Sequence, residues 1–69
     1  MRIINQDRNA SFDIDHIAIY IEQQTIYTVV GNKNVLLGSY DSEIKAKKVF
    51  DDIHDSYYME CRDFKMPKF

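Results

Sequence analysis

Apolar and polar residues alternate along most of the first forty positions of the chain. Ile17, Ile19 and Ile21 alternate with polar or small residues, which is the period of a strand that buries one face. Other runs have the same character, and the expected strands lie at about 2–5, 15–22, 25–30 and 35–40. The pattern therefore predicts a small antiparallel sheet of three or four strands.

A different period begins after position 41. Asp41 and Ser42 are both good N-caps, and Glu43 follows in the first turn, where the helix dipole favours an anion. The apolar residues after it recur at helical spacing, at Ala46, Val49, Phe50, Ile53 and Tyr57. We expect one amphipathic helix at about 42–58 that packs on the sheet. The predicted fold class is α+β, with a single domain over 1–69.

Tight turns between the strands would set which side chains face each other. Tyr20 would then lie opposite Tyr27 across the first pair of strands, and Val30 opposite Val35 across the second. The helix-facing side would be aliphatic, and the residues expected to be buried are Ile19, Ile21, Val30, Leu37, Val49, Phe50 and Ile53. A one-residue slip in either turn would exchange the faces of the strand beyond it.

The other face of the sheet would also carry apolar and aromatic side chains, at Tyr20, Tyr27, Leu36 and Tyr40. One helix cannot cover both faces of a sheet. We therefore expect this second face to be an interface between copies of the chain, making the protein a homo-oligomer. The alternative is that the N-terminal segment or the C-terminal tail folds over it.

Size, charge and cysteine content limit what can stabilise the domain, which partners it can bind and where in the cell it acts. A chain of 69 residues buries little surface, and small domains often add disulfides, a metal or a partner subunit. Cys61 is the only cysteine, so no disulfide can form within the chain. The net charge is −2, which would not attract DNA or RNA. No leader or membrane-spanning run is evident, so we expect a cytoplasmic protein that does not bind membranes.

Candidate chemistry is sparse. Asp51, His54 and Asp55 share a helix face, but two carboxylates and one imidazole are a weak metal signal. Cys61 lacks a Gly-rich loop or an oxyanion motif to make it a nucleophile. We expect no catalytic residues, no metal and no cofactor, and hence no enzyme activity. The acidic residues Asp51, Asp52 and Asp55 are instead candidates for docking on a partner protein.

The C-terminal tail, 62–69, has a different composition from the rest of the chain. It combines three cations with two aromatic residues, including Arg62 and Phe64. Such a mixture can pair with a phosphate and stack on a base. The tail could equally add a strand that protects an edge of the sheet, ending at Pro67.

Three segments together resemble a group of short proteins encoded by phages and prophages of Gram-positive bacteria. They are the opening MRIINQD, the stretch LLGSYDSEIKAKKVFDDIHDSY and the ending FKMP. Proteins of that group typically open with Met-Arg-Ile-Ile-Ser-Gln-Asp-Gly, begin a helix at a Gly-x-Tyr-Ser-Thr-Glu type of sequence and close on an aromatic-x-x-Pro segment. This chain has Arg8 where the group usually has Gly.

The resemblance implies a function. Some proteins of the group look like anti-Thoeris sponge proteins, which bind a cyclic ADP-ribose immune signal and sequester it without turnover. The resemblance implies that this chain is a non-enzymatic accessory protein that acts in a bacterial host and binds a cyclic nucleotide-type ligand. Ligand contacts would fall on Arg62 and Phe64, with Tyr57 and Tyr58 nearby. The alternative is a small inhibitor or adaptor that docks on a host or phage protein through its acidic helix face.

Overall fold

The computed structural model describes residues 1–68, so Phe69, the last residue of the predicted tail, lies outside the described residues. Two three-stranded sheets and one helix share a core. The elements along the chain are β1 (Arg2–Ile4), β2 (Ser11–Asp13), the 3-10 turn η1 (Ile14–His16), β3 (Ala18–Glu22), β4 (Thr25–Val30), β5 (Lys33–Ser39), α1 (Glu43–Tyr58) and β6 (Asp63–Lys65). The predicted α+β class is confirmed.

The first sheet has the order β2-β1-β6 and joins the two ends of the chain. β1 pairs antiparallel with β2 and parallel with β6. The tail therefore does add a strand, which places Ile3 opposite Phe64. The sequence pattern did not predict β2, because Ser11–Asp13 holds a single apolar residue between two polar ones.

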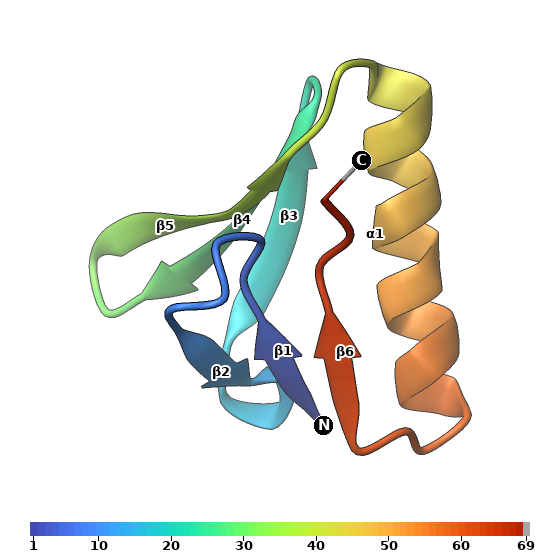
Figure 1. Cartoon of the computed structure of the whole chain (residues 1–69). Coiled ribbons are helices and arrows are strands. Elements are labelled where there is room, and N and C mark those ends of the chain that lie inside the picture. The colour runs from blue at the N-terminus through green and yellow to red at the C-terminus, as the bar shows by residue number, and fades with distance from the viewer. Residues whose placement is uncertain (69) are drawn as a thin grey trace.

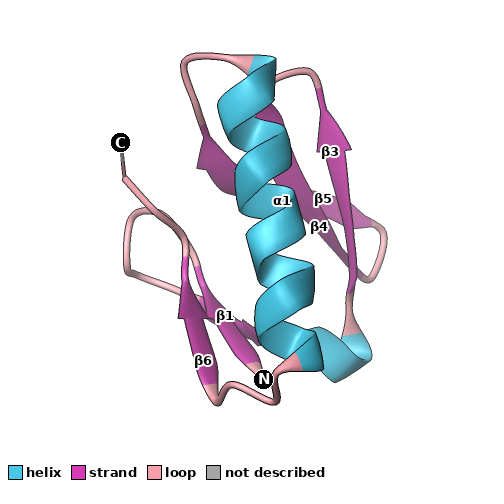
Figure 2. Ribbon diagram, turned by 90° about the vertical axis from the view of Figure 1, so that its right-hand side faces the viewer, coloured by secondary structure: helices cyan, strands magenta, loops and turns pink. Residues whose placement is uncertain are grey.

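The second sheet is the antiparallel meander β3-β4-β5, and Figure 1 shows α1 lying along one side of the molecule with β6 and β1 beside it. Viewed from the helix side, α1 passes in front of both sheets (Figure 2). Its buried residues Ala46, Val49 and Ile53 meet Ile26 of β4 and Ile3 of β1 in one core cluster. Leu37, Tyr40 and Met66 complete this cluster.

The helix begins where the sequence predicted. Ser42 is the N-cap, and its Oγ accepts a hydrogen bond of 3.1 Å from the Lys45 backbone N–H. Such a cap stabilises a helix by about 1 kcal/mol. Glu43 occupies the first turn, as expected, and the apolar stripe at Ala46 and Val49 faces the core.

Two-residue turns connect the strands of the meander, and the register of β3 on β4 is as predicted. Tyr20 lies opposite Tyr27, and their rings stack with centroids 5.3 Å apart. The predicted pairing of Val30 with Val35 is wrong, because the turn is only Gly31–Asn32 and Val30 pairs with Lys33. Val30 lies at the end of its strand and is 44% exposed, so its predicted burial is also wrong.

A β-bulge in the pairing of β4 with β5 changes which residues reach the core. Tyr27 pairs with Leu36, whereas Ile26 pairs with Gly38, so Leu37 is the extra residue. One extra residue shifts the alternation, and the side chains beyond it change faces. Tyr40 is consequently buried, with 3% of its surface exposed, and the prediction that it lies on the open face is wrong.

The other core predictions divide into fully buried and half-buried residues. Leu37, Val49 and Ile53 are fully buried, as predicted. The three remaining residues of the predicted core pack against it but are only half-buried: Ile19, Ile21 and Phe50. Ile19 and Ile21 are on β3, the strand at the edge of the sheet.

Candidate functional site

The C-terminal end of α1 is held in a defined geometry. The Cys61 N–H donates to the Ser56 carbonyl at 3.0 Å, and the Glu60 N–H donates to the Tyr57 carbonyl at 3.0 Å. This pair of bonds is the Schellman arrangement, which needs a left-handed residue directly after the helix cap. Glu60 occupies that position with φ of 60°, where a glycine would be unstrained. The chain therefore turns sharply away from the helix at Glu60.

Tyr57 links this helix end to the segment between the two sheets. Its Oη donates a 2.7 Å hydrogen bond to Oδ1 of Asp15, which lies in η1. The hydrogen bond that Tyr57 donates to Asp15 and the charge of the same carboxylate raise the pKa of Tyr57. Tyr57 is 49% exposed, so it remains accessible despite this hydrogen bond.

Asp15 itself belongs to a small polar cluster. Its backbone N–H donates to Oδ1 of Asp13 at 3.1 Å, and the His16 ring lies 3.1 Å from the other Asp13 oxygen. The hydrogen bond from the Asp15 backbone is the main cause of the lowered pKa of Asp13. These contacts fix the orientation of η1 and so of the acceptor that Tyr57 meets.

His54 lies one turn before Tyr58 and is fixed by its own helix. Its Nδ1 is 2.9 Å from the Phe50 carbonyl, and since a carbonyl can only accept, Nδ1 is the donor. The ring also packs on Phe50, with centroids 4.7 Å apart. The His54 residue is exposed and lines two cavities.

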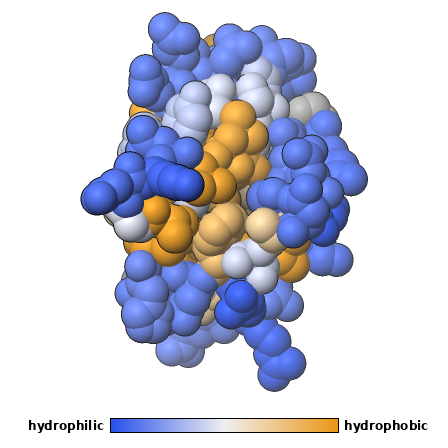
Figure 3. All heavy atoms as spheres, turned by 90° about the vertical axis from the view of Figure 1, so that its left-hand side faces the viewer, coloured by the Kyte–Doolittle hydropathy of each residue, from blue (hydrophilic) through white to orange (hydrophobic). Residues whose placement is uncertain are grey.

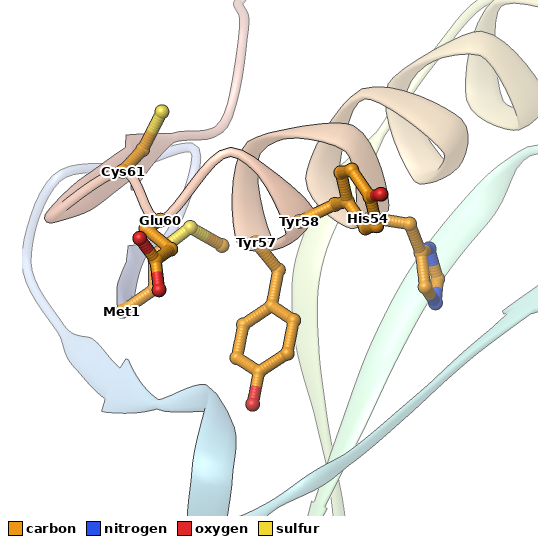
Figure 4. Close-up of a pocket in the computed structure, with 6 residues that line it drawn as sticks. All are labelled: Met1, His54, Tyr57, Tyr58, Glu60 and Cys61. Carbon is orange, nitrogen blue, oxygen red and sulfur yellow. The ribbon is translucent and has the colours of Figure 1, made fainter.

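Two neighbouring cavities flank His54 and Tyr57. The larger, of about 590 Å³, is lined by residues from the end of α1, the turn after it and the start of the chain (Figure 4): Met1, His54, Tyr57, Tyr58, Glu60 and Cys61. The second, of about 450 Å³, lies beside β3 and is lined by Ile14, Asp15, Ile17, Ala18, Ile19, His54 and Tyr57. The larger one is within the size range of small-molecule sites.

The predicted ligand contacts are only partly brought together. Tyr57 and Tyr58 do line the larger cavity. Arg62 is exposed and is not among its lining residues, and its carbonyl accepts from the Arg2 N–H at 3.0 Å. Phe64 is half-buried in β6 and packs against the core, so its ring is not free to stack on a base.

The residues predicted to form an interface between copies do not all lie on the same face of the sheet. Tyr20, Tyr27 and Leu36 share the face of the meander away from the helix, and Leu36 is 45% exposed. Tyr40 is in the core instead. Figure 3 shows an apolar area at the centre of the side opposite α1, surrounded by hydrophilic residues.

The acidic residues predicted for docking lie along α1. Asp51 and Asp55 are exposed, and Asp52 forms a long ion pair of 3.7 Å with Lys48. Among residues 1–68, no group of three acidic, His or Cys side chains could hold a metal ion. Within the same described part of the chain, no helix is long and apolar enough to cross a membrane.

Sequence reasoning missed three residues that shape this region: Met1, Asp15 and Glu60. Asp15 reaches Tyr57 across 42 positions of the chain, and no local pattern signals such a contact. The left-handed position after a helix is usually a glycine, and here it is Glu60, so the sequence does not mark it.

No protein-family model, curated protein or solved structure matches this chain.

Proposed function

We propose that this chain is a non-enzymatic phage or prophage accessory protein of a bacterial host, and that it acts by binding another protein as an inhibitor or adaptor. The docking surface would be the acidic side of α1 together with the cavity at its C-terminal end. The observation that carries the proposal is the exposure of Tyr58, which is 86% exposed beside that cavity. Tyrosine is one of the residue types enriched among the few that carry most of the binding energy of protein interfaces.

The charges around Tyr58 favour a cationic partner segment. Asp51 and Asp55 precede it by seven and three positions, so they lie on the same side of the helix. Glu60 adds a carboxylate, and the C-terminal end of a helix carries a partial negative charge. An arginine or lysine side chain could pair with these carboxylates and lie over the Tyr58 ring.

Sequestration of a cyclic nucleotide-type signal is the second candidate. It is supported by the size of the larger cavity, by the two predicted tyrosines that line it and by the family resemblance. The negative environment at the helix end disfavours a phosphate there. For this reason we rank protein docking first.

Affinity capture from a bacterial host extract tests the first proposal. Asp51→Lys combined with Asp55→Lys should lose a partner that the parent protein retains. The matched control is Asp7→Lys combined with Asp63→Lys, which makes the same change in net charge outside α1 and should retain it. A partner retained equally by all three proteins would count against docking through α1.

Isothermal titration with cyclic ADP-ribose isomers and cyclic nucleotides tests the second candidate. Tyr58→Ala should abolish binding, whereas Met59→Ala, at a neighbouring 73% exposed residue, should not. Phe64→Ala is a poor probe because it also removes packing against the core. Heat of binding that is lost in Tyr58→Ala and kept in Met59→Ala would replace the docking proposal with sequestration.

A further inference from the structure

β3 presents an open edge of the second sheet. It is the outer strand in the order β3-β4-β5, and four of its five residues, Ala18 to Ile21, are apolar or aromatic. Proteins usually protect such edges with lysine, proline, a bulge or a covering segment. The register of β3 on β4 is regular, and none of those residue types occurs in β3.

The opposite edge of the same sheet is covered. The Gln6 N–H donates to the Leu37 carbonyl at 2.8 Å, and its side chain bonds to both the N–H and the carbonyl of Ser39. The fold therefore closes the β5 edge with its own chain. Among residues 1–68, no comparable segment covers β3, and Figure 2 shows β3 at the margin of the sheet.

The hairpin geometry identifies the main-chain groups that are left on this edge. Glu22 and Thr25 close a two-residue turn, and such a closing pair is hydrogen-bonded. Bonded and non-bonded pairs alternate, so Tyr20 also bonds to β4. The N–H and carbonyl groups of Ile19 and Ile21 then point outward, away from β4.

The side chains of this strand also lack cover. Ile19 and Ile21 face the helix side and pack against the core, yet both are only half-buried. The 450 Å³ cavity beside β3 lies in the same gap, between Ile17, Ile19 and the Tyr57 ring. The β3 edge therefore has both unpaired main-chain groups and incompletely buried apolar side chains.

We propose that a second copy of this chain pairs with β3, antiparallel, about a two-fold axis at Tyr20. Full overlap of the five-residue strands places Ile19 opposite Ile21 of the second copy. These are the residues whose main-chain groups point outward, so each pair exchanges two hydrogen bonds. Glu22 meets Ala18 of the second copy, and no like charges face each other within the paired strands.

This pairing would extend the tyrosine stack and close the cavity beside β3. The Tyr20–Tyr27 stack continues across the axis into the same two residues of the second copy. The hairpin turn of the second copy lies beside Ile17 and Ala18, so it forms one wall of the 450 Å³ cavity. Two-fold dimers are the commonest protein assemblies. The apolar face at Leu36 is not the contact surface in this dimer.

Light scattering after size-exclusion chromatography tests the proposal. The parent protein should have twice the mass of the 8.2 kDa chain at high micromolar concentration. Tyr20→Lys should give a monomer with an unchanged circular dichroism spectrum, because two ammonium groups would face each other across the axis. Tyr27→Lys is the matched control. It removes the same ring stack, but residue 27 lies one strand away from the axis, so this variant should remain a dimer.

A covalent test covers the case in which Tyr20→Lys fails to fold. Directly opposed residues in a non-bonded antiparallel pair have Cα atoms about 4.5 Å apart, which suits a disulfide. In a Cys61→Ser background, Tyr20→Cys should form a covalent dimer under mild oxidation and Tyr27→Cys should not. A monomeric parent, or a dimer that Tyr27→Lys dissociates and Tyr20→Lys does not, would overturn the proposal. Pairing through β3 is independent of what α1 binds, so a failed capture experiment leaves this result unaffected.

Discussion

The side-chain amide of Gln6 forms a pair of hydrogen bonds with the main chain of Ser39. Nε2 donates to the Ser39 carbonyl at 3.1 Å, and Oε1 accepts from the Ser39 N–H at 3.0 Å. Nε2 also donates to the Pro67 carbonyl at 3.0 Å. One side chain thus connects β5 to the segment after β1 and to the C-terminal tail.

Loss of the Gln6 amide should loosen this junction. Net contributions of about 1 kcal/mol per hydrogen bond imply that Gln6→Ala, which removes three such bonds, costs about 3 kcal/mol in the free energy of unfolding. Hydrogen exchange should show reduced protection at the Ser39 amide, and chemical denaturation should give the change in free energy. Gln24→Ala is the control, because its exposed side chain makes none of these contacts, and it should stay close to the parent. Equal stability of the two variants would remove Gln6 from this role.

Much of the fold was predictable because local chemistry determines it. Ser42 caps the helix, the apolar spacing of Val49 and Ile53 selects the buried face, and the register of Tyr20 on Tyr27 follows from a two-residue turn. These features depend on residues within a few positions of each other. The short strand β2 carries too few apolar residues to be recognised alone.

The errors came from a turn shorter than expected at Gly31–Asn32, from a single inserted residue and from contacts distant in sequence. The bulge at Leu37 moves Tyr40 into the core, and regular alternation cannot anticipate it. Tyr57 was placed in the apolar stripe, but it lies half-exposed at the helix end, where it bonds to Asp15. Of the predicted ligand contacts, only the two tyrosines on the helix line the cavity, because Arg62 and Phe64 belong to the segment that pairs with β1.

Two isoleucines of α1 should differ sharply in their contribution to stability. Ile53 is fully buried, whereas Ile44 is 81% exposed. Ile53→Ala should lower the free energy of unfolding by about 3 kcal/mol, as expected for a large-to-small change in a core. Ile44→Ala, the same substitution in the same helix, should change it by less than about 0.5 kcal/mol. Urea denaturation of both variants would measure these values, and similar midpoints would place Ile53 outside the core.

Glu60 is a position where a substitution should stabilise the protein. Its φ of 60° is strained for a residue with a Cβ atom and is unstrained for glycine. Glu60→Gly should therefore raise the free energy of unfolding by up to about 1 kcal/mol, after the greater freedom of glycine in the unfolded chain is counted. Ser56→Gly, in the last turns of the same helix, should lower it by about 0.5–1 kcal/mol. A lower melting temperature for Glu60→Gly would mean that the carboxylate has a stabilising role that outweighs this strain.

Burial of Tyr40 should appear as a loss of stability at high pH. Its exclusion from water raises its pKa from 10.0 to about 12, although the Arg8 charge opposes this shift. The unfolded chain therefore releases this proton first, and the free energy of unfolding should fall as the pH rises from 10 to 12. Tyr40→Phe should lose part of this dependence, whereas Tyr58→Phe, at an 86% exposed side chain, should retain it. Urea denaturation across this pH range measures the slopes, and a slope for Tyr40→Phe equal to that of the parent would contradict the burial of the Tyr40 hydroxyl.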